Sequence, residues 1–373
     1  MGVKIRGKAA SSKRRFWLTL RPAGYAVIGL LIACQSGTAL DTVSQDYLKR
    51  LSRVLDTPVT EEPVMPLARY PAKRELQQPF ADQRVDFLRF LRLDICDFQR
   101  LIGGRNSSFG KVMPPSQRLV YEHAWAHEWY QCLLPQQEQL EEDVLAELSV
   151  IAAIKDQERP THRWNATWAS DEFRRLFSQA VEPYAINETL PVSEVTTAIQ
   201  YFQQISQSQY QMTLIRSSEL EQQLAVLHHQ QALGRWAVSV QQLVISLQQS
   251  AVMIQQRLTQ RPFCPQGVPT DKARVLQTVF FKVYAAQLQP YLSQLTKAGQ
   301  AWLPALDDLQ RQQSVDVRRF ERYWQAHWQM AAPTSLWQQL LSARDAHTQA
   351  WQDILGQCGL MPKVEDFNQV DAE

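Results

Sequence analysis

Residues 236–258, WAVSVQQLVISLQQSAVMIQQRL, carry the clearest periodic pattern in the chain. Large apolar side chains recur there at steps of three or four residues: Trp236, Val240, Leu243, Leu247, Ala251, Ile254 and Leu258. This spacing follows the turn of an α-helix, so these side chains share one face, and the Gln residues between them face water. The stretch therefore predicts a long amphipathic helix that packs against other helices.

The sequence on both sides extends this helical pattern. Residues 193–260 contain no Pro and a single Gly, Gly234. One unbroken helix of that length would extend about 100 Å, so we expect a break near Ser206–Gln211 or near Gly234. Beyond a loop at 261–267, the pattern predicts helices at 271–299, 302–329 and 335–356, with a kink or stop at Pro290.

The first half of the chain is also predicted to be helical, with more interruptions. We expect helices at 41–55, 81–102, 116–132 and 136–155. Several Pro residues predict an extended segment at 57–78 that lies over the body. Gly103-Gly104 predicts a helix end, a loop follows at 105–115, and Ser116 is a candidate N-terminal cap. Residues 156–192 are mixed and join the two halves.

No stretch shows the alternation expected of a β-strand. The predicted fold is therefore all-α, an elongated multi-helix bundle with long antiparallel helices, preceded by a lipoprotein signal peptide. We divide the chain into four parts: a leader (1–33), a tether (34–42), an N-terminal helical subdomain (43–192) and a C-terminal long-helix bundle (193–373).

The N-terminus has the three-part pattern of a bacterial secretion signal. Residues 1–22 contain seven Lys and Arg residues and no acid, and the apolar run that follows ends at Ala33. The sequence LIAC at 31–34 resembles the lipobox of bacterial lipoproteins. That resemblance implies cleavage before Cys34 and acyl chains, such as palmitate, on Cys34. Gln35 then favours the outer over the inner membrane. The alternatives are an ordinary secretion signal and an uncleaved anchor.

The charge of the chain argues against nucleic acid as a partner. The leader holds seven of the 39 Lys and Arg residues and none of the 37 acids, so residues 34–373 carry a formal net charge of −5. A weakly acidic body lacks the basic surface that phosphates require.

Cysteine usage fits an oxidising compartment. Without Cys34, four cysteines remain, and four permit two disulfides in three pairings. We prefer Cys96–Cys132 and Cys264–Cys358, because each pair joins neighbours in the predicted helical order. The alternative is four buried thiols.

Three polar groupings are candidates for chemistry. Ser108 and Lys111 match the S-x-x-K nucleophile motif of penicillin-binding proteins, but the companion motifs are missing. His123 and His127 have the helical spacing of a zinc site without an evident third ligand, and we predict no metal and no cofactor. The third is a polar loop that could bind a carboxylate or a sugar, or could cap two helices: Arg105, Asn106, Ser107, Ser108, Lys111, Gln117 and Arg118.

One stretch carries a family resemblance. RNSSFGKVMPPSQRLVYE (105–122), DYLKRL (46–51) and FLRFLRL (87–93) resemble an uncharacterised Gram-negative lipoprotein family, domain of unknown function 3080. The resemblance covers most of the chain after Cys34. It implies a lipoprotein with a helical body, and no catalytic residue, because the family has no established activity.

These features favour a non-enzymatic outer-membrane lipoprotein that faces the periplasm and contacts an envelope protein. One alternative is an envelope hydrolase that uses Ser108 and Lys111 or a metal at His123 and His127. Another is a carrier for an apolar ligand, which would need a cavity among the helices.

Overall fold

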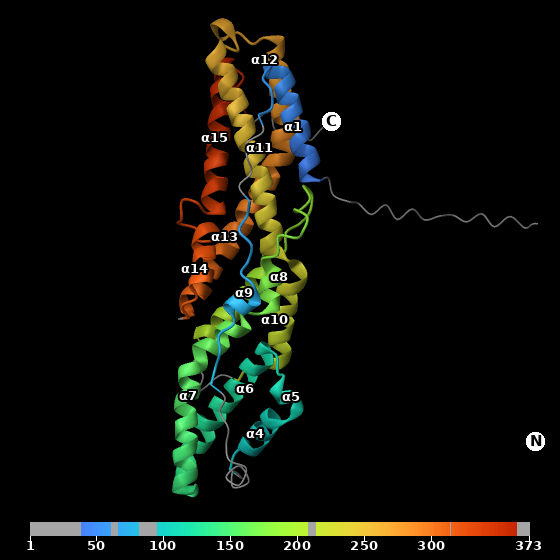
Figure 1. Cartoon of the computed structure of the whole chain (residues 1–373). Coiled ribbons are helices and arrows are strands. Elements are labelled where there is room, and N and C mark those ends of the chain that lie inside the picture. The colour runs from blue at the N-terminus through green and yellow to red at the C-terminus, as the bar shows by residue number, and fades with distance from the viewer. Residues whose placement is uncertain (1–38, 61–65, 82–94, 208–213, 314, 364–373) are drawn as a thin grey trace, which may run out of the picture. The chain divides into compact units, whose positions relative to one another are not determined.

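The computed structural model describes residues 39–60, 66–81, 95–207, 214–313 and 315–363. Within these ranges every regular element is a helix and there is no strand, which confirms the all-α prediction (Figure 1). The predicted leader (1–33), its lipobox and most of the tether lie outside the described residues.

The pattern at 236–258 forms the buried face of helix α11 (Ala232–Gln260). Five members of the predicted stripe are fully buried: Trp236, Val240, Leu243, Leu247 and Ile254. Helices α1 (Leu40–Leu55) and α15 (Leu336–Gln357) pack along α11 (Figure 1). The amphipathic stretch is therefore the helix around which its neighbours assemble.

The helix that follows α11 runs back along it. It consists of α12 (Asp271–Val279), the π-helix η4 (Phe280–Leu288) and α13 (Gln289–Gln312). Trp236 Nε1 near the start of α11 donates to the Leu295 carbonyl oxygen at 2.9 Å. This is the long antiparallel pair of the predicted bundle. α15 runs parallel to α11, since the two helices share a disulfide, Cys264–Cys358, just beyond their C-terminal ends.

Two predicted features of this region are corrected. The helix does not stop at Pro290, which lies in the first turn of α13 directly after η4, where the hydrogen-bond pattern already changes and a missing N–H is tolerated. The predicted helix 302–329 is two helices, because α13 ends at Gln312 and α14 starts later (Arg318–His327).

The stretch 193–260 forms three helices in place of one. α9 (Val192–Gln207) ends inside the first predicted break, α10 (Ser217–Gln230) follows, and Gln231 has a positive φ of 50° between α10 and α11. This second break lies three residues before Gly234, near the predicted position. Gly234 itself lies inside α11, where the Cβ of any other residue would come within 1.8 Å of the Ser178 carbonyl oxygen.

Helix ends in the first half differ from their predicted positions. α4 (Phe98–Asn106) continues through Gly103-Gly104, and α5 (Ser108–Lys111) occupies the predicted loop. α6 (Pro115–His127) begins at Pro115, whose missing N–H is tolerated in a first turn, and Ser116 bonds Glu221 instead of capping the helix. Residues 82–94 of the predicted helix 81–102 lie outside the described residues.

Shorter elements complete this half. η1 (Glu128–Leu133) and η2 (Leu134–Gln139) lead from α6 into α7 (Glu142–Ala166), which continues through Pro160 beyond its predicted end at Lys155. α2 (Lys73–Leu76) lies in the segment predicted to be extended, and α8 (Asp171–Leu176) lies in the mixed stretch.

Two hydrophobic clusters hold the helices together. The main cluster includes side chains from Leu40 to Cys358 and draws on both sides of position 192. The second, around Trp125 and Trp129, joins α4, α6 and α7. The run Ser217–Gln260 is long and apolar enough to cross a membrane by composition alone, but 67% of its most apolar window is buried within the protein, as in a soluble core helix.

Candidate functional site

A pocket of about 250 Å³ lies beside the second cluster, between residues 80–81 and helices α4, α6 and α7. Among the described residues, its charged wall residues are the cations Arg105, Arg118 and Lys155. The remaining wall residues are aromatic, apolar or amide side chains: Phe80, Ala81, Ile102, Asn106, Tyr121, Trp125 and Ile151. The pocket therefore combines positive charge with aromatic surface.

The segment before residue 82 is fastened over α7, and this places Phe80 at the pocket. Trp164 Nε1 donates to the Leu76 carbonyl oxygen at 2.7 Å. The Asn165 side chain accepts from the Gln78 backbone N–H at 2.9 Å and donates to the Gln78 carbonyl at 2.8 Å. The Ala81 N–H donates to Glu158. Residues 76–81 thus lie over the body. The Pro-rich sequence predicts this placement for residues 57–78, which overlap the start of this segment.

Beneath the pocket, two of its cations hold one buried carboxylate. Lys155 Nζ lies 2.6 Å from Glu122 Oε2, and Arg118 Nε lies 2.6 Å from Glu122 Oε1. The Glu122 side chain is 2% exposed, and those of Lys155 and Arg118 are 10% and 11% exposed. Arg118 and Glu122 are four residues apart on α6, while α7 supplies Lys155. Packing of the two helices therefore completes the cluster.

Burial and charge set the protonation states in this cluster. Burial opposes ionisation of Glu122, but the charges of Lys155 and Arg118 outweigh it and keep its pKa below the ordinary value. Burial lowers the pKa of Lys155 against the pull of Glu122. Burial also lowers the pKa of His162, which lies 3.8 Å from Glu122, to about 4. His162 is therefore neutral at pH 7.

Aromatic rings flank both cations. The Arg118 guanidinium carbon lies 5.1 Å from the centre of the Phe80 ring and 5.4 Å from that of Tyr121. Lys155 Nζ lies 5.0 Å from the Tyr121 ring centre and 5.1 Å from that of Trp125. Such contacts favour a cation where water is excluded.

The predicted polar loop is divided by the structure. Arg105, Asn106 and Arg118 line the pocket. Gln117 instead bonds Ser217 and Glu221 of α10. Ser107 caps α5 by accepting the Gly110 N–H at 3.0 Å.

Gly110 makes the turn between α4 and α5 possible. A Cβ at this position would come within 2.4 Å of the carbonyl oxygens of Gly104 and Arg105. The Arg105 guanidinium in turn donates to the Gly110 carbonyl at 2.7 Å. These contacts fold α5 against the end of α4, which explains why the two glycines at 103–104 do not end the helix.

Sequence reasoning missed the other half of the pocket. Phe80, Tyr121 and Lys155 were not candidates, although they supply two of its rings and one of its cations. One feature of the sequence could have indicated a buried charge. Lys155 follows Leu148 and Ile151 on the apolar side of a predicted helix.

The two catalytic candidates are not assembled into sites. Ser108 and Lys111 are exposed on the four-residue helix α5, and no hydrogen bond joins their side chains among the described residues. His123 is fully buried and His127 is half-buried on α6. Among the described residues, the group of three or more side chains whose metal-ligating atoms all lie within 4.8 Å of one another is Cys96, Glu128 and Cys132, without either histidine.

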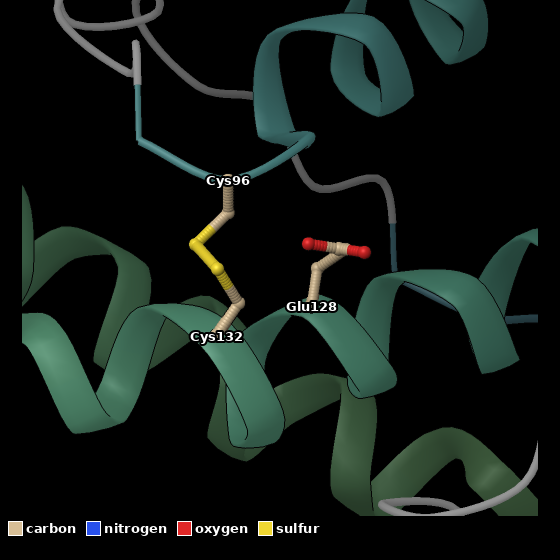
Figure 2. A group of neighbouring side chains, drawn as sticks. All are labelled: Cys96, Glu128 and Cys132. Atoms are coloured by element: carbon tan, nitrogen blue, oxygen red, sulfur yellow. A yellow bond between two sulfur atoms is a disulfide. The ribbon is translucent and has the colours of Figure 1, made fainter.

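The four cysteines of the described chain form two disulfides, Cys96–Cys132 and Cys264–Cys358, the pairing that the helical order predicts. Figure 2 shows Glu128 beside the first bridge. Because both sulfurs are bonded to each other, they are not thiolates that could hold a metal with Glu128. The Glu128 carboxylate accepts the Asp97 backbone N–H at 3.3 Å instead.

The chain matches the model of a protein family. The family model described as "Protein of unknown function (DUF3080)" matches residues 44–362. No curated protein and no solved structure matches the chain.

Proposed function

Because the chain belongs to the DUF3080 family of proteins of unknown function, we propose that it is a lipid-anchored envelope protein whose helical body contacts an envelope partner and catalyses no reaction. The anchor would be acyl chains on Cys34, and the body would face the periplasm from the outer membrane.

The distribution of the five cysteines carries this proposal. The four in the described residues pair with one another, which suits an oxidising compartment and leaves Cys34 without a partner among them. Cys34 is also the residue that ends the lipobox-like LIAC. Several acyl chains on one thiol and amine would hold the protein at a membrane durably.

The geometry of the polar residues favours binding over catalysis. A nucleophile needs a base within hydrogen-bond reach, about 3 Å. The Ser108 hydroxyl and the Lys111 ammonium have no such contact with each other in the described chain, and Phe109 between them is 72% exposed. This exposed segment is a poor place to exclude water around a reaction.

Mass spectrometry with membrane fractionation tests the anchor. The full-length protein and its Cys34→Ala variant are expressed in a Gram-negative host. We expect the wild type to gain the mass of a triacylated cysteine, to lose residues 1–33 and to fractionate with outer membranes, and the variant to lose all three properties. A soluble, unacylated wild-type protein would exclude the lipoprotein assignment.

The matched control replaces cysteines of the helical body by alanine. The double variant Cys96→Ala with Cys132→Ala also removes cysteine sulfur but leaves Cys34 in place, so it should keep the acyl mass and the membrane association. Crosslinking of the anchored wild type at the outer membrane then tests for a partner. Recovery of the uncrosslinked chain alone would argue against the contact role.

A further inference from the structure

The described wall of the pocket carries cations, and the carboxylates that pair with them lie outside it. Arg118 and Lys155 share the single carboxylate of Glu122, and His162 beside them is neutral. Glu158 lies 3.9 Å from the same Nε2 atom of His162 that Glu122 approaches, it accepts the Ala81 N–H, and its charge also acts on Lys155. Neither carboxylate is part of the described pocket wall, so the described surface that faces the pocket is positive.

Each charged acceptor that reaches a buried cation stabilises it, and an anion in the pocket would add one. Arg118 and Lys155 are each 9% exposed, so bulk water screens them little. The Arg118 Nη atoms donate to no described residue, and Lys155 uses one of three donors on Glu122. Donors therefore remain for a further acceptor.

The open space lies where that acceptor would be needed. Both cations line the same pocket of about 250 Å³, and Arg105 lines it too. The volume is below the range usual for drug-sized ligands, so the occupant must be small. Phe80, Tyr121 and Trp125 form walls that suit a flat apolar group.

We infer that this pocket, between α4, α6 and α7, binds a small organic carboxylate whose charged group meets Arg118 and Lys155 and whose planar body lies among Phe80, Tyr121 and Trp125. A guanidinium matches a carboxylate with two parallel hydrogen bonds. The site does not depend on the lipid anchor, so the two proposals can fail separately.

Isothermal titration calorimetry of the full-length protein in detergent tests the inference, with benzoate as the probe. We expect one benzoate per chain at millimolar concentration or tighter. Benzamide has the same shape without the charge and should bind at least about tenfold more weakly. Inorganic phosphate should also bind more weakly than benzoate, since it lacks the planar group.

The decisive variant is Lys155→Met, because it leaves the balanced pair Arg118–Glu122 and a side chain of similar length. Its benzoate affinity should fall at least about tenfold. Lys297→Met, the same change at an exposed position on α13, should bind like wild type. Circular dichroism and the thermal midpoint confirm that both variants are folded.

Four results would overturn the assignment. They are no benzoate binding at millimolar concentration, equal affinity for benzoate and benzamide, phosphate binding as tight as benzoate, and a folded Lys155→Met protein with unchanged affinity. Should Lys155→Met not fold, Arg118→Met is titrated in its place with the same expected loss.

Discussion

Tyr47 on α1 and His347 on α15 are 300 residues apart in the sequence, yet the Tyr47 hydroxyl lies 2.8 Å from His347 Nε2 in a buried site. Trp351 Nε1, one turn further along α15, donates to the Tyr47 oxygen at 2.8 Å. The first and last described α-helices are thus joined by a polar contact inside the main cluster. Such a contact stabilises the folded state when all its members are present, because a buried polar atom that loses a partner destabilises it.

We therefore expect Tyr47→Phe to destabilise the protein by about 1–3 kcal/mol, since it removes the hydroxyl that bonds both Trp351 and His347 and leaves these two only the 3.1 Å bond from Trp351 Nε1 to His347 Nε2. The loss is measured as the change in unfolding free energy from urea denaturation. Tyr201→Phe is the control, because the hydroxyl of this half-buried Tyr bonds to no described residue. Equal stability of the two variants would contradict the role given to the buried contact.

Acid should destabilise the protein through two buried histidines. Burial lowers the pKa of His347 to about 3 and that of His162 to about 4, against about 6.5 in the unfolded chain. Below about pH 6.5 the unfolded chain therefore binds protons that the native state does not. The stability that both residues contribute is full above that pH, and it is lost as the pH falls toward the native pKa values.

The expected slope is up to about 1.4 kcal/mol per pH unit for each histidine. Urea denaturation between pH 7 and pH 4 measures it. His347→Gln should show a shallower slope, and His228→Gln, at an exposed position on α10, should keep the wild-type slope. A pH-independent stability of the wild type would show that neither histidine is held neutral by burial.

The two disulfides should differ in their contribution to stability. Cys264–Cys358 closes a sequence separation of 94 residues, and Cys96–Cys132 closes one of 36. In the chain-entropy view the longer loop stabilises more, about 4.5 kcal/mol against about 4 kcal/mol. Paired Cys→Ser variants of each bridge, compared by urea denaturation, should show this order. A larger loss for the shorter loop would mean that native-state packing, and not loop length, dominates.

Substitution by alanine at two helical glycines should change the stability of the protein in opposite directions. At Gly234 a Cβ would come within 1.8 Å of the Ser178 backbone, so Gly234→Ala should separate α11 from this segment and cost about 3 kcal/mol or more. At Gly104 no atom lies within 4 Å, so Gly104→Ala should stabilise α4 by up to about 1 kcal/mol. Thermal midpoints of the two variants measure the difference. A tolerated Gly234→Ala would exclude the close approach as the reason for this glycine.

Removal of Glu122 tests the buried cluster without any ligand. Glu122→Gln leaves Arg118 and Lys155 buried without the carboxylate that both contact, so we expect a loss of about 3–5 kcal/mol in unfolding free energy. Glu219→Gln breaks an exposed pair with Arg216 and should change stability by less than about 1 kcal/mol. Similar losses for the two variants would mean that water reaches the cluster.

How far the sequence predicts the structure depends on the range of the interactions involved. The stripe from Trp236 to Ile254 is a local pattern, and its burial in α11 follows from helix geometry alone. The cysteine pairs were predictable for a related reason, because each joins neighbours in the helical order. Pro115 and Gly234 show the limit, since the packing around them, and not their intrinsic propensities, decides their place in a helix.

By itself, the sequence determined the all-α class, the central amphipathic helix and the lipobox-like LIAC, because each is a pattern within a short stretch. It favoured the observed disulfide pairs through the order of the helices but left other pairings and free thiols open. Only the tertiary structure decided the pocket. Arg118 is in a stretch that the sequence marked as polar, but Lys155 comes from another helix and Phe80 from a segment fastened over it. The contact between these residues depends on how α6 and α7 pack. Glu122 joins Arg118 to Lys155 in a buried position only when the two helices have packed and excluded water.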